Sequence, residues 1–226
     1  MRGLSMEFNE VVRTTFAARA FTDEPVTDAE LRSLFDNARF APSGGNRQPW
    51  RVIVVRDRGP RDALLPLIRP TMQRYMAQMQ AGEAPWNTVN PTRLTDEQIA
   101  ATPAPEALLR QVLDAPVLLV IFVDLSYVAA FDADLDRVGV IAGASIYPFV
   151  WNLLLSARNI GLGGTLTTFA GARESDVQAL FGVPSHFAFA AMLPIGHPVK
   201  QLTRLKRGPI EDFVRLEHWS GPTLPG

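Results

Sequence analysis

The chain has 226 residues, of which 47% are hydrophobic and 20% charged, and its formal net charge is −1. This size and composition are typical of one globular domain, and the balanced charge argues against binding to nucleic acid or an anionic membrane. Cysteine is absent, which excludes disulfides, thiolate nucleophiles and cysteine-held metal or iron–sulfur sites, so redox chemistry requires an organic cofactor or a non-thiolate metal.

The N-terminal part of the chain predicts two helices followed by a strand. Apolar residues at helical spacing from Phe8 predict a helix that ends before Phe21. Residues 27–30 form a capping box, which begins a second helix that Pro42 stops. Residues 50–56 are rich in β-branched and apolar side chains, as a buried strand would be.

The loop between this second helix and the strand is the most informative segment. It carries two glycines, the Ser43 hydroxyl, the amides of Asn46 and Gln48 and the Arg47 guanidinium on one short turn. Such a turn can hold a large, flat ligand with polar edges. Ser43 has no histidine close to it in sequence, so we favour a hydrogen-bonding role over that of a nucleophile.

Residues 60–110 differ in composition, being rich in Met, Pro, Gln and Ala, and contain a second capping box at 95–98. Tyr75 and three methionines recur there at helical spacing. Two interpretations remain open for this stretch. It is a helical insertion that serves as a lid, or a satellite helix that packs its methionines on the core.

The second half of the chain mixes strands and helices without regular alternation. One helix predicted for 139–159 is apolar on nearly every side, so it should be buried in a core or a subunit interface, with a kink or break at Pro148 and a cap at Gly161. The class is α+β, with a tail after Val214 that we expect to be a surface arm or to wrap a partner. The other predicted elements are strands at 117–124, 162–169 and 187–195 and a short helix at 175–181.

Several other functions are excluded by their missing motifs. The glycines at 161–164 follow a helix, whereas a dinucleotide-binding loop opens one, and no phosphate-binding P-loop exists. The three histidines stand singly, so we expect no metal site. The chain shows no secretory signal and no membrane-spanning run. We therefore expect a cytoplasmic protein that binds neither nucleic acid nor membrane.

The chain resembles the FMN-dependent nitroreductase family. The resemblance is strongest in ARFAPSGGNRQPWRVIVV, which matches the helix end, ligand-binding loop and strand of that family. Phe21 with Pro25-Val26 matches ahead of this stretch, and further matching segments follow it in the same order along the chain, namely Asp114-Ala115-Pro116, NIGLGGTLTTF, the turn 194–198 and the stretch 206–212. Six matching segments in the right order make coincidence improbable.

The resemblance implies a nitroreductase-like fold with a central, mainly antiparallel sheet flanked by helices. It covers nearly the whole chain apart from two parts, so we expect one domain over 1–226, with a helical insert or lid at about 60–110 and a C-terminal arm at about 214–226 as these parts. An intertwined homodimer would hold two FMN molecules at the subunit interface, and it would bury the apolar helix 139–159 between protomers.

The resemblance also assigns site residues. The loop would contact FMN from one subunit, the stretch 165–168 would run along the isoalloxazine ring, and the cations would neutralise the phosphate. Gln111 would lie at the pyrimidine edge. The cofactor-binding residues so expected are Arg19, Pro42, Ser43, Asn46, Gln111, Thr165, Leu166, Thr167, Lys206 and Arg207, and no side chain is expected to act as a covalent catalyst.

One departure from the family concerns the phosphate. The family usually carries an R-R-S-x-R-type motif where this chain reads Thr15-Phe16-Ala17-Ala18-Arg19, so only Arg19 is retained. Either Arg13, one helical turn from Ala17, compensates, or the phosphate is held more weakly, mainly by Arg19 and Arg207.

The expected activity is that of an NAD(P)H oxidoreductase with a ping-pong mechanism. NAD(P)H would reduce the flavin and leave, and a nitroaromatic, quinone or related acceptor would then take its place. If the insert is a lid, its apolar residues would set the choice of acceptor, namely Tyr75, Met76, Met79 and Trp86. Two alternatives stay open. The protein is a flavin-binding or sensing module with little turnover, or a specialised relative such as a dehalogenase or a flavin-fragmenting enzyme.

Overall fold

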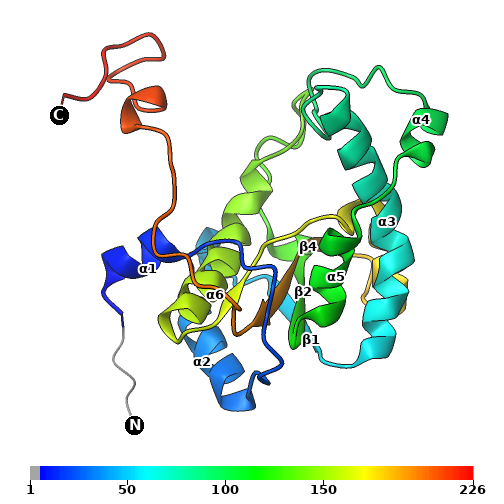
Figure 1. Ribbon diagram of the computed structural model, residues 1–226. Coiled ribbons are helices and arrows are strands. Elements are labelled where there is room, and N and C mark those ends of the chain that lie inside the picture. Colours follow the sequence, from blue (N-terminus) through cyan, green and yellow to red (C-terminus); the bar gives the residue numbers. More distant parts are fainter. Residues whose placement is uncertain (1–5, 226) are drawn as a thin grey trace.

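A four-stranded antiparallel sheet lies at the centre of the computed structural model, which describes residues 6–225 (Figure 1). The strand order is β1-β2-β4-β3, and all three pairings are antiparallel. This arrangement confirms the predicted mainly antiparallel sheet. The strands are β1 (Trp50–Val55), β2 (Val117–Asp124), β3 (Gly163–Gly164) and β4 (Phe187–Gly196).

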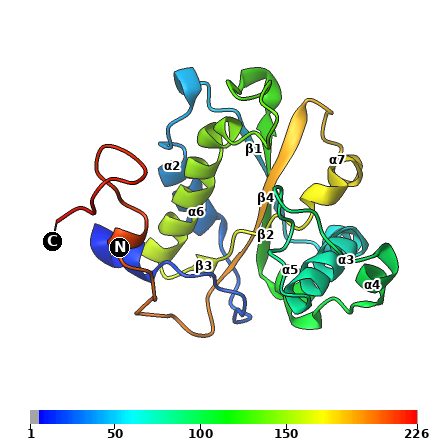
Figure 2. The ribbon, with the colours of Figure 1, turned by 90° about the horizontal axis from the view of Figure 1, so that it is seen from above.

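Helices cover both faces of this sheet (Figure 2). One face is covered by α2 (Asp28–Ala38) and α6 (Tyr147–Asn159), and the N-terminal α1 (Phe8–Thr14) packs beside α6. The other face carries α3 (Arg58–Gln80), α5 (Glu106–Asp114) and α7 (Glu174–Phe181), with the short α4 (Asp96–Ala101) beside α3.

The central strand β2 explains the two cores. All eight of its residues are buried, and because side chains alternate along a strand, successive residues enter opposite cores. Leu119 and Ile121 pack into the core under α2 and α6. Val120 and Phe122 pack into the core under α3, α5 and α7.

Both predicted capping boxes are present. The Thr27 hydroxyl accepts from the backbone N–H of Glu30, whose carboxylate accepts from the N–H of Thr27, at the start of α2. Thr95 and Gln98 make the same reciprocal pair at the start of α4. Each box satisfies two backbone donors that a helix start leaves without partners.

The helix predicted for 139–159 is broken, as the proline suggested. A 3₁₀ turn covers Ile141–Ser145, and α6 begins only at Tyr147, with Pro148 in its first turn. Proline fits there because the first turn does not need its missing N–H. One stripe of α6 is not buried within the chain, since Tyr147 and Trp151 are each 43% exposed.

The strand predicted for 162–169 is wrong in extent. Only Gly163 and Gly164 pair with β4, followed by an isolated bridge between Thr167 and Met192. Gly164 lies so close to β4 that a Cβ there would stand 2.5 Å from the Ile195 side chain. Beyond them the chain leaves the sheet.

The stretch 60–110 is partly core. Leu64, Ile68 and Met72 of α3 and Leu109 of α5 are almost completely buried against the sheet. By contrast, Met79 is 52% exposed. The part that lies outside the core is thus the segment between α3 and α5, which contains α4.

Arg61 fastens α3 to the sheet. Its side chain is buried, and the burial lowers the pKa of the guanidinium. It has no carboxylate partner within 4.0 Å among the described residues and instead donates to main-chain oxygens at the end of β1 and before β2, namely those of Val55, Arg56, Leu113, Ala115 and Pro116.

The C-terminal segment 199–225 runs away from the sheet past α1 (Figure 1). Gln201 ties its root to α1 by donating to the Thr14 carbonyl at 3.0 Å. Farther along, Phe213 is 73% exposed and Trp219 97% exposed.

Candidate functional site

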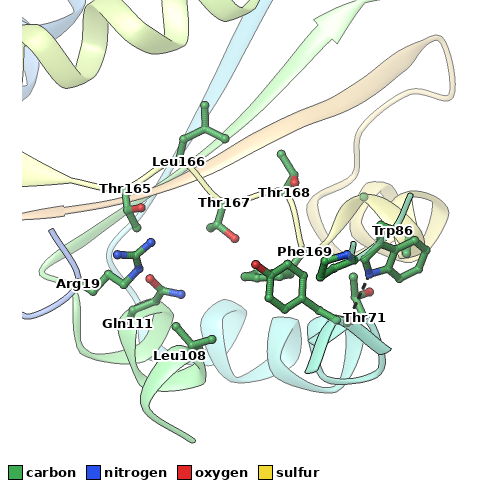
Figure 3. Close-up of a pocket in the computed structure, with 14 residues that line it drawn as sticks. Arg19, Thr71, Trp86, Leu108, Gln111, Thr165, Leu166, Thr167, Thr168 and Phe169 are labelled. Carbon is green, nitrogen blue, oxygen red and sulfur yellow. Dashed lines mark hydrogen bonds between the residues drawn. The ribbon is translucent and has the colours of Figure 1, made fainter. Parts of the chain in front are cut away.

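A cavity of about 780 Å³ opens between α5, the end of α3 and the segment after β3 (Figure 3). This volume lies in the range of ligand and cofactor pockets. Four parts of the chain form its walls. The lining residues are Arg19, Thr71, Tyr75, Pro85, Trp86, Leu108, Gln111, Thr165, Leu166, Thr167, Thr168, Phe169, Gly171 and Ala172.

The segment after β3 forms one wall. The close contact between Gly164 and β4 brings the chain to the cavity, and the single bridge at Thr167 holds it there. The backbone N–H of Thr167 donates to the Met192 carbonyl at 3.0 Å, so it is not free to stabilise a negative charge. Thr167 offers the cavity its hydroxyl instead.

Two buried polar atoms of this cavity have no hydrogen-bond partner within the described chain. They are Oε1 of Gln111, on α5, and Oγ1 of Thr167. Both residues are almost completely buried, with exposed fractions of 3% and 6%. Because an unsatisfied buried polar atom costs free energy, two of them in one cavity indicate a polar ligand.

Arg19 reaches the cavity from the segment after α1. Ala17 forms a parallel bridge with Gly164, and the Ala18 N–H donates to the Gly164 carbonyl at 3.0 Å, so this segment runs beside β3. The Arg19 side chain makes one weak hydrogen bond, at 3.3 Å, to the Ala17 carbonyl. Its charge is therefore available to a ligand, and it is the one charged residue among those that line the described cavity.

Aromatic side chains close the outer end of the cavity (Figure 3). Tyr75 of α3 meets Phe169 edge to face, with ring centroids 5.7 Å apart. Trp86, from the segment after α3, contributes its indole, whose N–H donates to the Thr71 carbonyl at 3.4 Å. These rings provide flat apolar surface.

The glycine-bearing loop lies apart from this cavity. No residue of 42–49 lines it in the described chain. The loop is held in a sharp conformation, with positive φ at Gly45, Asn46 and Gln48, and the Ser43 hydroxyl accepts from the Gln48 N–H at 2.9 Å. Positive φ at non-glycine residues is costly and is often found at ligand sites.

Two contacts fix this loop and the start of β1, one with the 3₁₀ turn before α6 and one with α6 itself. The Gly44 N–H donates to the Ser145 hydroxyl at 3.1 Å. Trp50 stacks on Phe149, with ring centroids 4.7 Å apart and an interplanar angle of 7°. The loop is thus rigidly presented on the face of the sheet opposite α3.

Lys206 and Arg207 lie on the C-terminal segment 199–225 and are exposed. Arg207 donates to the Lys206 carbonyl at 2.7 Å and neither residue lines the cavity. The single chain therefore separates the expected site residues into two groups. It brings together Arg19, Gln111, Thr165, Leu166 and Thr167, and it leaves Pro42, Ser43, Asn46, Lys206 and Arg207 elsewhere.

In the altered phosphate motif, Thr15 makes a hydrogen bond to α1, and its neighbour Thr14 makes one with another part of the chain. The Thr15 hydroxyl donates to the Val11 carbonyl at 2.7 Å, and Thr14 accepts from Arg158 at 2.8 Å. Arg13 is exposed and does not line the described cavity. Arg19 is thus the member of this motif that the fold places at the site.

Sequence reasoning did not identify five lining residues. One of them had a usable signal: Thr71 lies four positions before Tyr75, so both share one face of α3. The others depend on how distant segments meet, which spacing does not reveal. They are Pro85, Phe169, Gly171 and Ala172.

The sequence profile of the nitroreductase family matches residues 12–197. The chain belongs to the nitroreductase family. Among curated relatives, an NADH dehydrogenase of Thermus thermophilus is 25% identical over 222 residues, which cover 87% of this chain and 89% of that protein. Human iodotyrosine deiodinase 1 is 28% identical over 214 residues, covering 93% of this chain and 68% of that protein.

Solved structures share the fold of this nitroreductase-family chain. A BluB-like flavoprotein from Clostridium difficile 630 superposes with a TM-score of 0.70 at 19% identity, covering 94% of this chain and 100% of that one. An oxidised iodotyrosine deiodinase bound to FMN and 3-iodo-L-tyrosine gives a TM-score of 0.66 at 22% identity, with the same coverage of 94% and 100%.

Among the described residues, no group of three or more His, Asp or Glu side chains is arranged to hold a metal ion. None of the described helices combines the length and the hydropathy that a bilayer crossing requires.

Proposed function

We propose that the cavity binds FMN and that the protein is an NAD(P)H-dependent flavin oxidoreductase that reduces nitroaromatic, quinone or related acceptors. The observation that carries this proposal is the pair of unpartnered buried atoms, Gln111 Oε1 and Thr167 Oγ1, in a cavity of about 780 Å³. The family assignment and the FMN-bound structural relative support the same cofactor.

The lining residues fit a flavin chemically. The pyrimidine edge of a flavin offers both N–H and C=O groups, which match the Gln111 amide and the Thr167 hydroxyl. The aliphatic side chains of Leu108 and Leu166 suit the faces of a flat ring system. Arg19 supplies a first positive charge for the phosphate, and a dianion needs more than one.

The missing cations suggest a second copy of the chain. Lys206 and Arg207 lie on the C-terminal segment 199–225, which carries exposed apolar side chains, and the rigid loop 42–49 does not line the cavity of its own chain. The exposed stripe of Tyr147 and Trp151 on α6 offers an apolar contact surface. A homodimer that joins these parts would complete two cofactor sites.

Each part of the chain then has a chemical task. A bound FMN supplies hydride acceptance from a nicotinamide donor and electron delivery to an acceptor. Gln111 and Thr167 orient the ring, and the cations retain the phosphate. The aromatic outer wall keeps water from the reacting faces and positions the acceptor, so no side chain needs to act as a nucleophile.

The first test is the absorption spectrum of the purified protein, with identification of the flavin after denaturation. Anaerobic mixing with NADH and with NADPH in a stopped-flow instrument should bleach the flavin within the time of a normal turnover. A protein that retains FMN but is bleached by neither donor would be a flavin-binding module, and the proposed activity would be rejected.

A pair of variants tests the cofactor site separately. Gln111→Leu removes one of the two unpartnered atoms and should weaken FMN retention, because the flavin edge loses a buried hydrogen bond. Gln73→Leu is the matched control, since Gln73 also lies on a helix but donates to the Ala100 carbonyl outside the cavity. Equal FMN affinity of the two variants would contradict the proposed location.

A further inference from the structure

The tip of the glycine-bearing loop, residues 43–48, keeps an unfavourable conformation without the support of burial. The φ angle is +52° at Asn46 and +49° at Gln48, left-handed values that non-glycine residues rarely adopt. None of residues 43–48 is buried, and 44–48 are exposed. Packing therefore does not impose this conformation, and hydrogen bonds have to hold it.

Most of the hydrogen bonds of the tip are local. The N–H of Asn46 donates to the Ser43 carbonyl at 2.9 Å, and the N–H of Gln48 donates to the Ser43 hydroxyl at 2.9 Å. Both partners belong to the tip and move with it. These bonds favour the turn, but they do not fix it relative to the rest of the protein.

A single hydrogen bond ties the tip to a distant part of the chain. The Gly44 N–H donates at 3.1 Å to the hydroxyl of Ser145, which lies 101 positions away in the sequence. Among the described residues, no other hydrogen bond from 43–48 reaches beyond the loop. Ser145 is only 7% exposed, whereas Gly44 lies on the surface. The buried hydroxyl is thus the fixed partner of this bond.

The 3₁₀ turn that carries Ser145 is held at both ends. At its start, the buried Asp132 carboxylate accepts from the N–H of Val140 at 2.7 Å and from the N–H of Ile141 at 3.3 Å. At its end, the turn leads into α6, whose Phe149 is buried in the core. The position of the Ser145 hydroxyl is therefore set by the core and not by the loop.

We infer that Ser145 is a positioning residue of the cofactor site, whose hydroxyl holds residues 43–48 in their ligand-binding conformation before FMN arrives. This inference rests on the proposed function, in which the loop contacts FMN. Without the bond, the strained tip would occupy other conformations for part of the time. The apparent dissociation constant would then rise by the reciprocal of the fraction that stays competent to bind.

Ser145→Ala tests the inference through the affinity for FMN. The variant should keep its fold, because the exposed Gly44 N–H can bond to water instead. Fluorescence titration of the flavin-free protein with FMN should give a dissociation constant about 3- to 12-fold above that of the parent, the range of one hydrogen bond. A smaller increase would overturn the inference and show that the local bonds or a second copy of the chain hold the tip.

Ser156→Ala is the matched control. Ser156 is as buried as Ser145, at 7% exposed, but it lies within α6 and makes no hydrogen bond to the loop among the described residues. Its affinity for FMN should match that of the parent, and the urea midpoints of the two variants should agree. An equal loss of FMN affinity in both variants would assign the effect to the loss of any buried hydroxyl and would reject the role of Ser145.

Hydrogen exchange provides a measurement that does not require FMN. In the flavin-free Ser145→Ala variant, the N–H groups of Asn46 and Gln48 should exchange faster than in the flavin-free parent, because local opening becomes easier. Saturation with FMN should restore their protection, which a purely structural role of Ser145 would not produce. Unchanged exchange in the flavin-free variant would contradict the inference.

The inference and the proposed function fail in different ways. If the parent binds no FMN, the proposed function fails, and exchange in the flavin-free protein still reports whether Ser145 holds the tip. If the parent binds FMN and is reduced by a nicotinamide donor, but Ser145→Ala binds FMN as the parent does, the proposed function stands and the role of Ser145 is wrong. Circular dichroism of each variant confirms that the comparison concerns folded protein.

Discussion

The cavity wall and the C-terminal segment 199–225 differ in where their side chains find partners. Around the cavity, Tyr75, Trp86 and Phe169 are held by contacts within their own chain. On the C-terminal segment, Phe213 and Trp219 are largely exposed. One half of the proposed site is therefore contained in a single chain. The other half has its cations and its large apolar side chains on the surface of that chain.

Two arginines show the same contrast between a side chain that is engaged within its own chain and one that is left on the surface. Arg61 is 4% exposed and satisfies main-chain oxygens that would otherwise be buried without a donor. Arg207 is exposed and bonds only to its neighbour Lys206 within the described chain. The first should matter for folding and the second for the ligand, and the predictions below test that division.

The largest effect is expected for Arg61→Leu. It leaves several main-chain oxygens buried without a donor, so the free energy of unfolding should fall by about 3 kcal/mol or more. Urea denaturation measures this change. Arg69→Leu, on the exposed side of the same helix, should change the free energy of unfolding by less than about 0.5 kcal/mol. Equal losses of unfolding free energy in both variants would show that Arg61 does not hold α3 to the sheet.

Arg207→Ala should leave the free energy of unfolding almost unchanged but weaken FMN binding. Loss of a charge-assisted bond to the phosphate costs about 1.5–3 kcal/mol, or about 10- to 150-fold in affinity. Fluorescence titration of the apoprotein with FMN measures it. Arg215→Ala, on the same C-terminal segment, is the control. An unchanged affinity for Arg207→Ala would place the phosphate elsewhere.

The two capping boxes allow a smaller, matched comparison. Thr27→Ala should lower the global free energy of unfolding by about 1 kcal/mol, because α2 packs on the core. Thr95→Ala removes the same motif from α4, none of whose residues is buried, so only local hydrogen exchange in α4 should increase. A global loss from Thr95→Ala would show that α4 supports the whole fold.

The smallest effect concerns the acid response of the segment before α6. The N–H of Val140 and, next, the Arg137 guanidinium lower the pKa of the Asp132 carboxyl below its ordinary value of 3.8. The lowered pKa stabilises the folded segment at neutral pH, and this contribution is lost as the pH falls below about 3.8 through the folded pKa.

Asp132→Asn provides the measurement. At pH 7 the variant should show faster hydrogen exchange at Val140 and Ile141 than the parent, and the difference should shrink in acid as the parent carboxyl becomes protonated. Asp134→Asn, at an exposed neighbouring position, should exchange as the parent does at both pH values. A difference for Asp132→Asn that persists unchanged in acid would contradict the assigned cause.

What the sequence predicted well was local. Capping at Thr27 and Thr95, the break at Pro148 and the left-handed glycines that close α6 and α7 each depend on a few adjacent residues, and the structure confirms them. Gln111 was expected to bind FMN through family resemblance; it lines the cavity, and its role in binding stays a prediction.

What the sequence did not predict depends on distant contacts. The strand after Leu162 was drawn too long, because pairing ends where Gly164 presses on Ile195 and no local pattern records that contact. The methionine stripe of α3 likewise divides between the core at Met72 and the surface at Met79. Tyr75 and Trp86 line the cavity together with Phe169. The contact between Tyr75 and Phe169 depends on tertiary packing, which the local sequence does not record.

Gly164 also determines which positions an engineer can vary to change acceptor range. A Cβ there would collide with the Ile195 side chain and with the Pro194 carbonyl, at 2.5 and 2.7 Å, so a substitution would displace the whole wall that follows it. Leu166 and Thr168 lie on the same segment but are exposed to the cavity. A mutant library that keeps position 164 as glycine and randomises 166, 168 and 86 would therefore sample new substrates with most of its members still folded.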